Sequence, residues 1–254
     1  MDNLGSFLEE KYNLYNRLEF IKDDPIQVPH YFTRKEDIEI SAFLTATISW
    51  GQRQTIIRNA WRLMEILRYS PYDSLLDDNN LNSEMVSGFV HRTFNAQDAF
   101  YFFKSLRNIY LNHGGLEKVF TDGYQKTGTV YGALIHFRKI FFELPYPEHC
   151  QRHLANVEKG ATAKRLNMFL KWMVRSDGIG VDFGLWKKIP AASLMLPLDV
   201  HTGNVSRALD LLIRKSNDWK AVEEITAKLR VFDPDDPIRF DYALFGLGAV
   251  EHWV

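Results

Sequence analysis

The sequence predicts an all-α protein, because apolar residues recur at helical spacing along most of the chain and strand-like alternation is nearly absent. Of the 254 residues, 46% are hydrophobic and 25% are charged, proportions that allow one large domain or two smaller lobes. No apolar run reaches membrane-spanning length, and the first residues lack the basic-then-apolar order of a signal peptide. We therefore expect a soluble, cytoplasmic protein that has no membrane partner.

Eight apolar stripes predict helices, and several of them stop at glycine or proline. The expected helices lie near residues 40–51, 56–70, 99–113, 130–144, 161–175, 202–213, 219–229 and 238–249. The last stripe is apolar on nearly every face, so we expect that helix to be buried.

The longest stretch without a helical period is 176–198, which contains three glycines and two prolines. Such a stretch favours a functional connection between lobes, although an ordinary crossover would have the same composition. We expect one lobe over 37–176, a helical barrel ending in a hairpin-like element, and a second lobe of 1–36 plus 177–254. A cleft is expected between the two lobes.

Cysteine and charge content narrow the function classes. The single cysteine excludes an internal disulfide framework, and no group of Cys and His residues has the spacing of a zinc or iron–sulfur site. We therefore expect neither a metal nor another cofactor.

A net charge of −1 does not suit a protein that coats nucleic acid, so any DNA contact must come from a local patch. Residues 151–190 form such a patch, with eight Lys or Arg against three Asp or Glu, whereas 232–254 is acidic.

Lys164 is expected in the first turn of the helix near 161–175. The partial positive charge of a helix N-terminus disfavours an ammonium group there by about 0.3–1 kcal/mol. A neutral amine is what a nucleophilic lysine needs, so this position favours covalent chemistry. The alternative is a solvent-exposed lysine on a basic face, which Asn167, Lys171 and Arg175 would share.

Asp199 stands directly before the apolar period of the next helix. An aspartate at that place caps the helix by accepting backbone N–H groups, and this role alone would explain it. The same hydrogen bonds keep the carboxylate ionised, which suits it to stabilise a cation or to accept a proton. His201, two residues later, either holds Asp199 or caps its own helix.

Taken together, these segments resemble the helix-hairpin-helix (HhH-GPD) DNA glycosylase superfamily, which contains endonuclease III. Gly160 followed by Lys164 is similar to the family's hairpin and the lysine that opens the next helix, and Leu198-Asp199-Val200-His201 is similar to its Val/Leu-Asp-x-His stretch. Residues 43–52 resemble the helix that ends in a Ser-x-x-Gln turn, and 240–248 the helix behind the catalytic aspartate. The resemblance covers roughly residues 38–250.

The separation of 35 positions between the lysine and the aspartate looks most like that of the archaeal 8-oxoguanine DNA glycosylase branch. The hairpin holds one glycine where the family prefers two, and the four-cysteine iron–sulfur loop of endonuclease III is absent, as in the metal-free branches.

The resemblance implies a base-excision repair enzyme acting on damaged double-stranded DNA near the nucleoid, without an obligate protein partner. Lys164 would attack the anomeric carbon of a flipped-out nucleotide such as 8-oxoguanosine, and Asp199 would accept a proton and stabilise the cationic sugar. Abasic-site lyase activity would follow from the Schiff base. The residues expected to contact DNA or the base are Trp50, Gln52, Arg92, Gly160, Lys171, Arg175 and His201.

Two other functions stay open at this stage. One is a nucleic-acid-binding relative that keeps the fold without the reaction. The other is an all-helical protein-interaction module or hydrolase in which Asp199, His201 and Asp241 serve another purpose. Tryptophans in an all-helical chain, Trp50 included, are more often core residues than a stacking face for a base, and Gln52 could equally be a polar residue in a tight turn.

Overall fold

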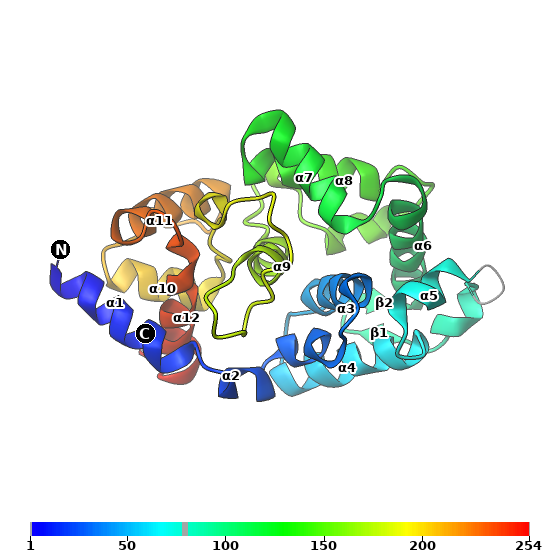
Figure 1. Cartoon of the computed structure of the whole chain (residues 1–254), viewed down its shortest axis with the longest axis horizontal. Helices are drawn as coiled ribbons and strands as arrows, with labels where there is room; N and C mark the ends of the chain where they lie inside the picture. The colour runs from blue at the N-terminus through cyan, green and yellow to red at the C-terminus, as the bar shows by residue number, and fades with distance from the viewer. Residues whose placement is uncertain (1, 78–80, 254) are drawn as a thin grey trace. The chain divides into compact units, whose positions relative to one another are not determined.

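The computed structural model describes residues 2–77 and 81–253 of the chain. The chain divides into two compact units (Figure 1). We call Asp23–Ala155 the middle unit, and Met1–Lys22 with Asn156–Val254 the terminal unit. The described N-terminal and C-terminal segments therefore belong to the same unit.

The described part of the middle unit contains six α-helices, one short hairpin and several 3-10 turns, among them Glu148–His153. The bounds of the helices and strands are α3 (Lys35–Thr47), α4 (Arg53–Ile66), α5 (Pro71–Leu76), β1 (Val90–His91), β2 (Phe94–Asn95), α6 (Ala96–Asn112), α7 (Leu116–Thr127) and α8 (Val130–Phe141). The two strands pair antiparallel, with His91 opposite Phe94. Arg92 in the two-residue turn has a φ of 55°, the left-handed conformation that such hairpins require.

Phenylalanines from three helices form the core of the middle unit. The ring of Phe43 on α3 lies 5.5 Å from that of Phe137 on α8, and Phe102 on α6 lies 4.7 Å from Phe141, measured between ring centroids. All four side chains are fully buried. Because each aromatic ring removes a large apolar area from water, this cluster fixes the packing of the three helices.

Helix α7 has no counterpart among the predicted helices. Gly123 sits inside it, and a Cβ at that position would lie 2.9 Å from the backbone Cα of Ala133 on α8. The glycine weakens the helical signal in the sequence, since glycine is a poor helix former. It also lets α7 and α8 approach closely, and packing between the two helices offsets the low helix propensity of the glycine.

The described part of the terminal unit is also helical. It contains α1 (Asp2–Tyr15), α2 (Glu19–Lys22), α9 (Lys164–Val174), α10 (Val200–Ala208), α11 (Trp219–Phe232) and α12 (Asp241–Phe245). A 3-10 turn, Pro237–Phe240, precedes α12, and a π-helical turn, Gly246–Val250, follows it. Helix α1 packs against α12.

The segment 176–198 has no α-helix, as the sequence predicts, but it lies within the terminal unit rather than between units. It packs on α9, where Phe183 N donates to Trp172 O at 2.8 Å and Trp186 N donates to Met173 O at 2.9 Å. Trp186 is buried with its ring 5.4 Å from that of Phe169. This segment therefore covers one side of α9.

The all-α prediction is confirmed, because β1 and β2 are the only strands among the described residues. Seven of the eight predicted stripes contain one helix each, with shifted ends. The stripe 202–213 ends early, at Ala208, because Asp210 adopts a φ of 56° and Leu211 N donates back to Ser206 O. The eighth stripe, 238–249, is buried as expected but is split into three short helical pieces.

The unit boundary at 155/156 differs from the expected lobe boundary at 176/177. As a result, Lys164 and Asp199 belong to one unit, whereas the expected lobes place them on two. Met1 and Val254, which the second expected lobe includes, lie outside the described residues. Within the described part of the chain, no helix is long and apolar enough to cross a bilayer.

Candidate active site

Lys164 is the first residue of α9, as the sequence predicts. The preceding turn begins with a 3-10 turn, Val157–Lys159, and passes through Gly160, whose φ of 82° is left-handed. Ala163 adopts the same conformation directly before the helix, with a φ of 51°. Gly160 O accepts a hydrogen bond from Trp219 N at 3.0 Å, which anchors the turn on α11. The Lys164 side chain is 27% exposed, so the amine is accessible.

Asp199 caps α10 with one of its two carboxylate oxygens. Oδ1 accepts from Thr202 N at 3.0 Å, and Thr202 Oγ1 accepts from Asp199 N at 2.9 Å, which completes a reciprocal capping box. Oδ2 lies 3.8 Å from Lys164 Nζ, beyond hydrogen-bonding distance. The cap therefore fixes the carboxylate and leaves one oxygen facing the amine, with the Asp199 side chain 26% exposed.

Beneath this pair, Lys171 is buried in a cluster of acidic and aromatic groups. Its Nζ lies 3.2 Å from Asp241 Oδ2, 3.8 Å from Asp182 Oδ1 and 3.5 Å from the centroid of the Tyr242 ring. The side chain is only 4% exposed. A buried ammonium needs such partners, because an unpaired charge away from water is very costly.

Asp241 interacts electrostatically both with the half-buried pair of Lys164 and Asp199 and with the buried cluster around Lys171. Burial raises the pKa of the Asp241 carboxyl, the positive charges of Lys171 and Lys164 oppose that rise, and Asp199 adds to it. The carboxyl is thus coupled electrostatically to both Lys164 and Asp199. The sequence analysis named Asp241 only in the alternative of a protein-interaction module or hydrolase.

Arg175 directly follows the last residue of α9, and its side chain is fully buried. Its guanidinium donates to Asp182 Oδ2 at 2.8 Å, to Asp177 Oδ2 at 2.9 Å and to Asp236 Oδ2 at 2.9 Å. Its Nη2 also donates to Tyr12 OH at 2.9 Å, which ties α1 to α9. Burial alone would lower the pKa of Arg175, but the carboxylates of Asp182 and Asp236 outweigh it and the pKa is raised.

The prediction that Lys171 and Arg175 contact DNA phosphates is therefore wrong. Neither side chain reaches solvent, and Asn167 on the same face is buried too. The face of α9 that the sequence predicts to be polar and exposed is covered by the segment 176–198 and by the C-terminal residues. Two basic residues of the stretch 151–190 pair with the acidic stretch 232–254 inside the terminal unit: Arg175 with Asp236 and Lys171 with Asp241.

His201 is exposed on the first turn of α10. The capping hydrogen bonds of Asp199 come from Thr202, so His201 does not hold the carboxylate through the cap. Asn217 Nδ2 instead donates to the Asp199 backbone carbonyl at 3.2 Å. The structure thus brings Lys164, Gly160 and Asp199 into one region and gives His201 no part in the cap.

Trp50, Gln52 and Arg92 lie together in the middle unit, on the turn between α3 and α4 and on the hairpin. His91 Nε2 is 3.1 Å from Trp50 O, and a Cβ on Gly51 would lie 3.0 Å from Arg92 Nη1. Gln52 and Arg92 are exposed. The ring of Trp50 is half-buried and already contacts two imidazoles, those of His91 at 4.9 Å and His153 at 6.0 Å.

The structure also brings together metal-binding residue types that the sequence analysis missed. Asp98, His149 and Cys150 of the middle unit place their potential ligand atoms within 4.8 Å of one another. In the sequence, only the adjacent pair His149 and Cys150 could have indicated a metal-binding group. Asp98 lies some fifty positions earlier, so spacing along the chain could not reveal the group.

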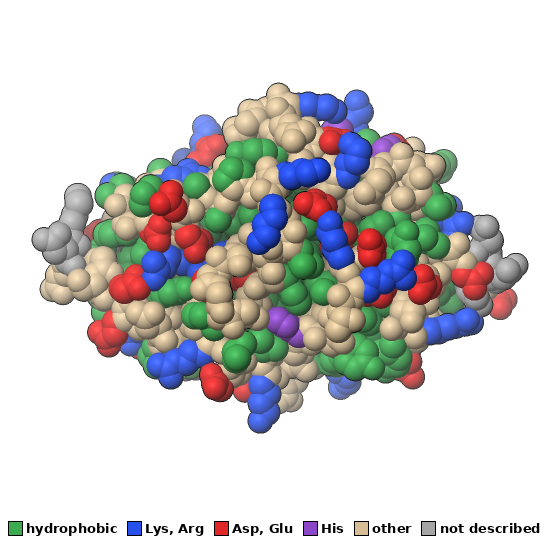
Figure 2. Space-filling model, in the orientation of Figure 1, with side chains coloured by type: hydrophobic (Ala, Val, Ile, Leu, Met, Phe, Trp, Pro, Cys, Tyr) green, Lys and Arg blue, Asp and Glu red, His purple; other side chains and the backbone are tan. Residues whose placement is uncertain are grey.

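Acidic and basic side chains are interspersed over the face drawn in Figure 2. This mixture agrees with the net charge of −1. Binding to a polyanion would therefore depend on a small number of contacts rather than on a broad field.

A protein-family model described as a protein of unknown function, DUF2400, matches residues 24–250. The match covers most of the chain and includes Lys164, Asp199 and the Asp98 group. No curated protein and no solved structure matches the chain.

Proposed function

The chain belongs to the DUF2400 family, and we propose that it is a DNA glycosylase that removes an oxidised purine such as 8-oxoguanine through Lys164 and Asp199. The observation that carries the proposal is the pair itself. An accessible amine at the first turn of one helix faces the free oxygen of an aspartate that caps another, at 3.8 Å.

In the proposed reaction, Asp199 accepts a proton from the Lys164 ammonium and the neutral amine attacks C1′ of a flipped-out nucleotide. The N-glycosidic bond breaks, its electron pair leaves with the base, and the base takes up the proton that Asp199 accepted from Lys164. The Asp199 carboxylate regenerated by this transfer stabilises the positive charge that develops on the sugar in the transition state. Opening of the sugar ring then gives a Schiff base between Lys164 and C1′, from which strand cleavage can follow.

The surroundings of the pair support this chemistry. The Asp199 carboxylate is held by the capping box, so it needs little reorganisation during the reaction. Lys171 and Arg175 are neutralised by buried carboxylates, which leaves Lys164 as the accessible lysine of its helix face. Gln52 and Arg92, exposed together in the middle unit, are proposed DNA contacts.

Borohydride trapping tests the proposal directly. The full-length protein is incubated with duplex oligonucleotides that carry one lesion each, beginning with 8-oxoguanine, and base release is measured alongside the reduced covalent adduct. We expect the wild type to release a base and to form an adduct. Lys164→Ala should abolish the adduct, and Asp199→Asn should slow base release by roughly 10²–10⁴-fold.

Lys228→Ala is the matched control, because Lys228 is an exposed lysine on α11 in the same unit. This variant should trap as well as the wild type. The proposal fails if no lesion yields an adduct, or if Lys164→Ala traps equally well. Duplex binding without base release would identify a nucleic-acid-binding protein, and no binding at low salt to a duplex with an abasic analogue would exclude both nucleic-acid functions.

A further inference from the structure

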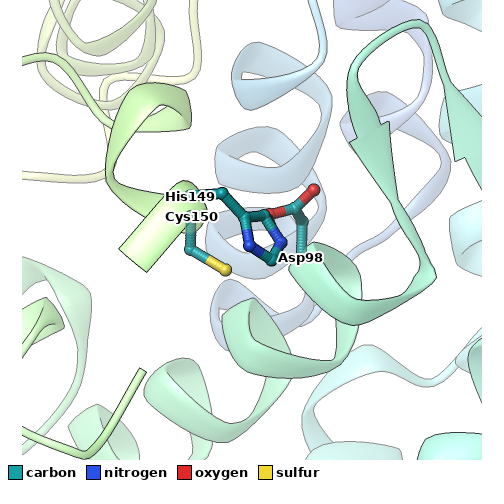
Figure 3. A group of neighbouring side chains, drawn as sticks. All are labelled: Asp98, His149 and Cys150. Atoms are coloured by element: carbon teal, nitrogen blue, oxygen red, sulfur yellow. Dashed lines mark ion pairs between the residues drawn. The ribbon is translucent and has the colours of Figure 1, made fainter. Parts of the chain in front are cut away.

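Three side chains of the middle unit meet where the start of α6 contacts the 3-10 turn Glu148–His153. Figure 3 shows the Asp98 carboxylate, from the first turn of α6, next to the His149 ring and the Cys150 side chain. His149 Nε2 lies 3.2 Å from Asp98 Oδ1, and the three ligand atoms are all within 4.8 Å of one another. All three residues belong to one unit, so their arrangement is defined within it.

The two oxygens of Asp98 have different surroundings. Oδ2 accepts from Asn95 N at 3.0 Å in the capping box of α6 and lies 3.2 Å from His153 Nε2. Oδ1 is buried and lies 3.2 Å from His149 Nε2, an arrangement in which neither atom makes a well-aligned hydrogen bond, and the Cys150 thiol also interacts with the Asp98 carboxylate. The whole Asp98 side chain is 0% exposed. The groups next to this buried oxygen, an imidazole nitrogen and a thiol, are themselves common metal ligands, so one shared ion would satisfy all three.

The residue types suit a zinc ion. Zn²⁺ binds thiolate, imidazole and carboxylate groups, at about 2.3 Å from sulfur and about 2.0–2.2 Å from nitrogen or oxygen. Tetrahedral ligands at those distances lie about 3.4–3.7 Å from one another. The 3.2 Å between Asp98 Oδ1 and His149 Nε2 is close to this spacing, and the Cys150 sulfur lies within 4.8 Å of both atoms.

The surroundings are also those of a metal site. Asn95 and His153 hold the other oxygen of Asp98, as outer groups do around metal-binding carboxylates. The His149 side chain is 34% exposed, which gives an ion a path from solvent. Cys150 and His153 are buried, so the other side of the group is closed.

We propose that Asp98 Oδ1, His149 Nε2 and Cys150 Sγ bind one Zn²⁺, with water as the fourth ligand. Binding releases the thiol proton of Cys150 to solvent and ties the 3-10 turn to α6. The alternative is a metal-free arrangement, in which the Cys150 thiol donates to the Asp98 carboxylate and the His149 ring lies beside Oδ1. The proposal is independent of the function proposed for Lys164 and Asp199.

Metal binding by the full-length protein decides between the two arrangements. The metal-stripped protein is titrated with Zn²⁺ in competition with a chromogenic chelator, and separately with Co²⁺, which reports a cysteine ligand through its thiolate-to-cobalt charge-transfer absorption. We expect one ion per chain and that absorption. Cys150→Ser and His149→Gln should each weaken Zn²⁺ binding by at least about 10²-fold, with far-ultraviolet circular dichroism confirming that they remain folded.

His136→Gln is the matched control, since His136 lies on α8 of the same unit, outside the group. This variant and Lys164→Ala should bind Zn²⁺ like the wild type. Absence of the cobalt–thiolate absorption, or equal Zn²⁺ affinity in the wild type and the two ligand variants, would overturn the proposal in favour of the metal-free arrangement.

Discussion

The two ends of α9 use the same residue types in opposite ways. At its start, Lys164 is 27% exposed and faces one carboxylate oxygen at 3.8 Å. At its end, Lys171 and Arg175 are buried among the carboxylates of Asp182, Asp236 and Asp241. Burial and the number of partners, rather than residue type, therefore separate a side chain available for chemistry from one committed to the fold.

The largest expected difference between the two ends is in stability. Arg175→Ala should lower the free energy of unfolding by about 3–5 kcal/mol, because it leaves buried carboxylates without their counter-charge. Lys164→Ala should change it by no more than about 0.5 kcal/mol, since exposed pairs contribute little. Equilibrium unfolding in urea measures both values, and similar losses for the two variants would contradict the distinction.

The next effect concerns pH. Burial raises the pKa of Asp236 from 3.8 to about 6, although Arg175 opposes the rise. Because the folded state holds this proton more tightly than the unfolded state, Asp236 makes the protein less stable as the pH rises from about 4 to 6. Asp177 has the opposite effect at lower pH. Burial would raise the pKa of its carboxyl, but the hydrogen bond from Asn16 and the charge of Arg175 outweigh burial, so the pKa is lowered. Because the unfolded state then binds the proton more tightly, Asp177 makes the protein less stable as the pH falls below about 4.

Asp236→Asn isolates this contribution. Between pH 4 and 7, the wild type should lose on the order of 1–3 kcal/mol of stability relative to the variant, as measured by urea unfolding at each pH. Parallel pH profiles for the two proteins would show that the Asp236 carboxyl titrates alike in the folded and unfolded states.

The turn that leads into α9 should give a smaller effect. Gly160 has a left-handed φ of 82°, and a Cβ there meets no atom within 4 Å. Gly160→Ala should therefore cost about 1–2 kcal/mol through backbone strain alone. Thermal unfolding measures the loss. Full stability of Gly160→Ala would mean that the turn relaxes without strain.

The smallest effect separates the two roles of Asp199. Asp199→Ala removes the helix cap and should cost about 1 kcal/mol, whereas Asp199→Asn keeps a capping oxygen and should cost only a few tenths. Base release should fall strongly in both variants, because both lack the carboxylate. If activity followed stability across the two variants, capping would be the whole role of Asp199.

The sequence by itself determined the helical class and the two positions at which Lys164 and Asp199 open helices. Both follow from local rules, because apolar periodicity and capping chemistry act over a few neighbouring residues. The distance between the two side chains could not be predicted from the sequence. It depends on how α9, α10 and the segment 176–198 pack.

Only the tertiary structure decided which polar residues are buried. Periodicity assigned Lys171 and Arg175 to an exposed face, but segments distant in the chain cover that face and supply its counter-charges. The same limit hid the group of Asp98, His149 and Cys150, since the three come together only when α6 meets the turn at 148–153. Burial and the pairing of distant charges are properties of the packed chain, and a pattern of neighbouring residues does not contain them.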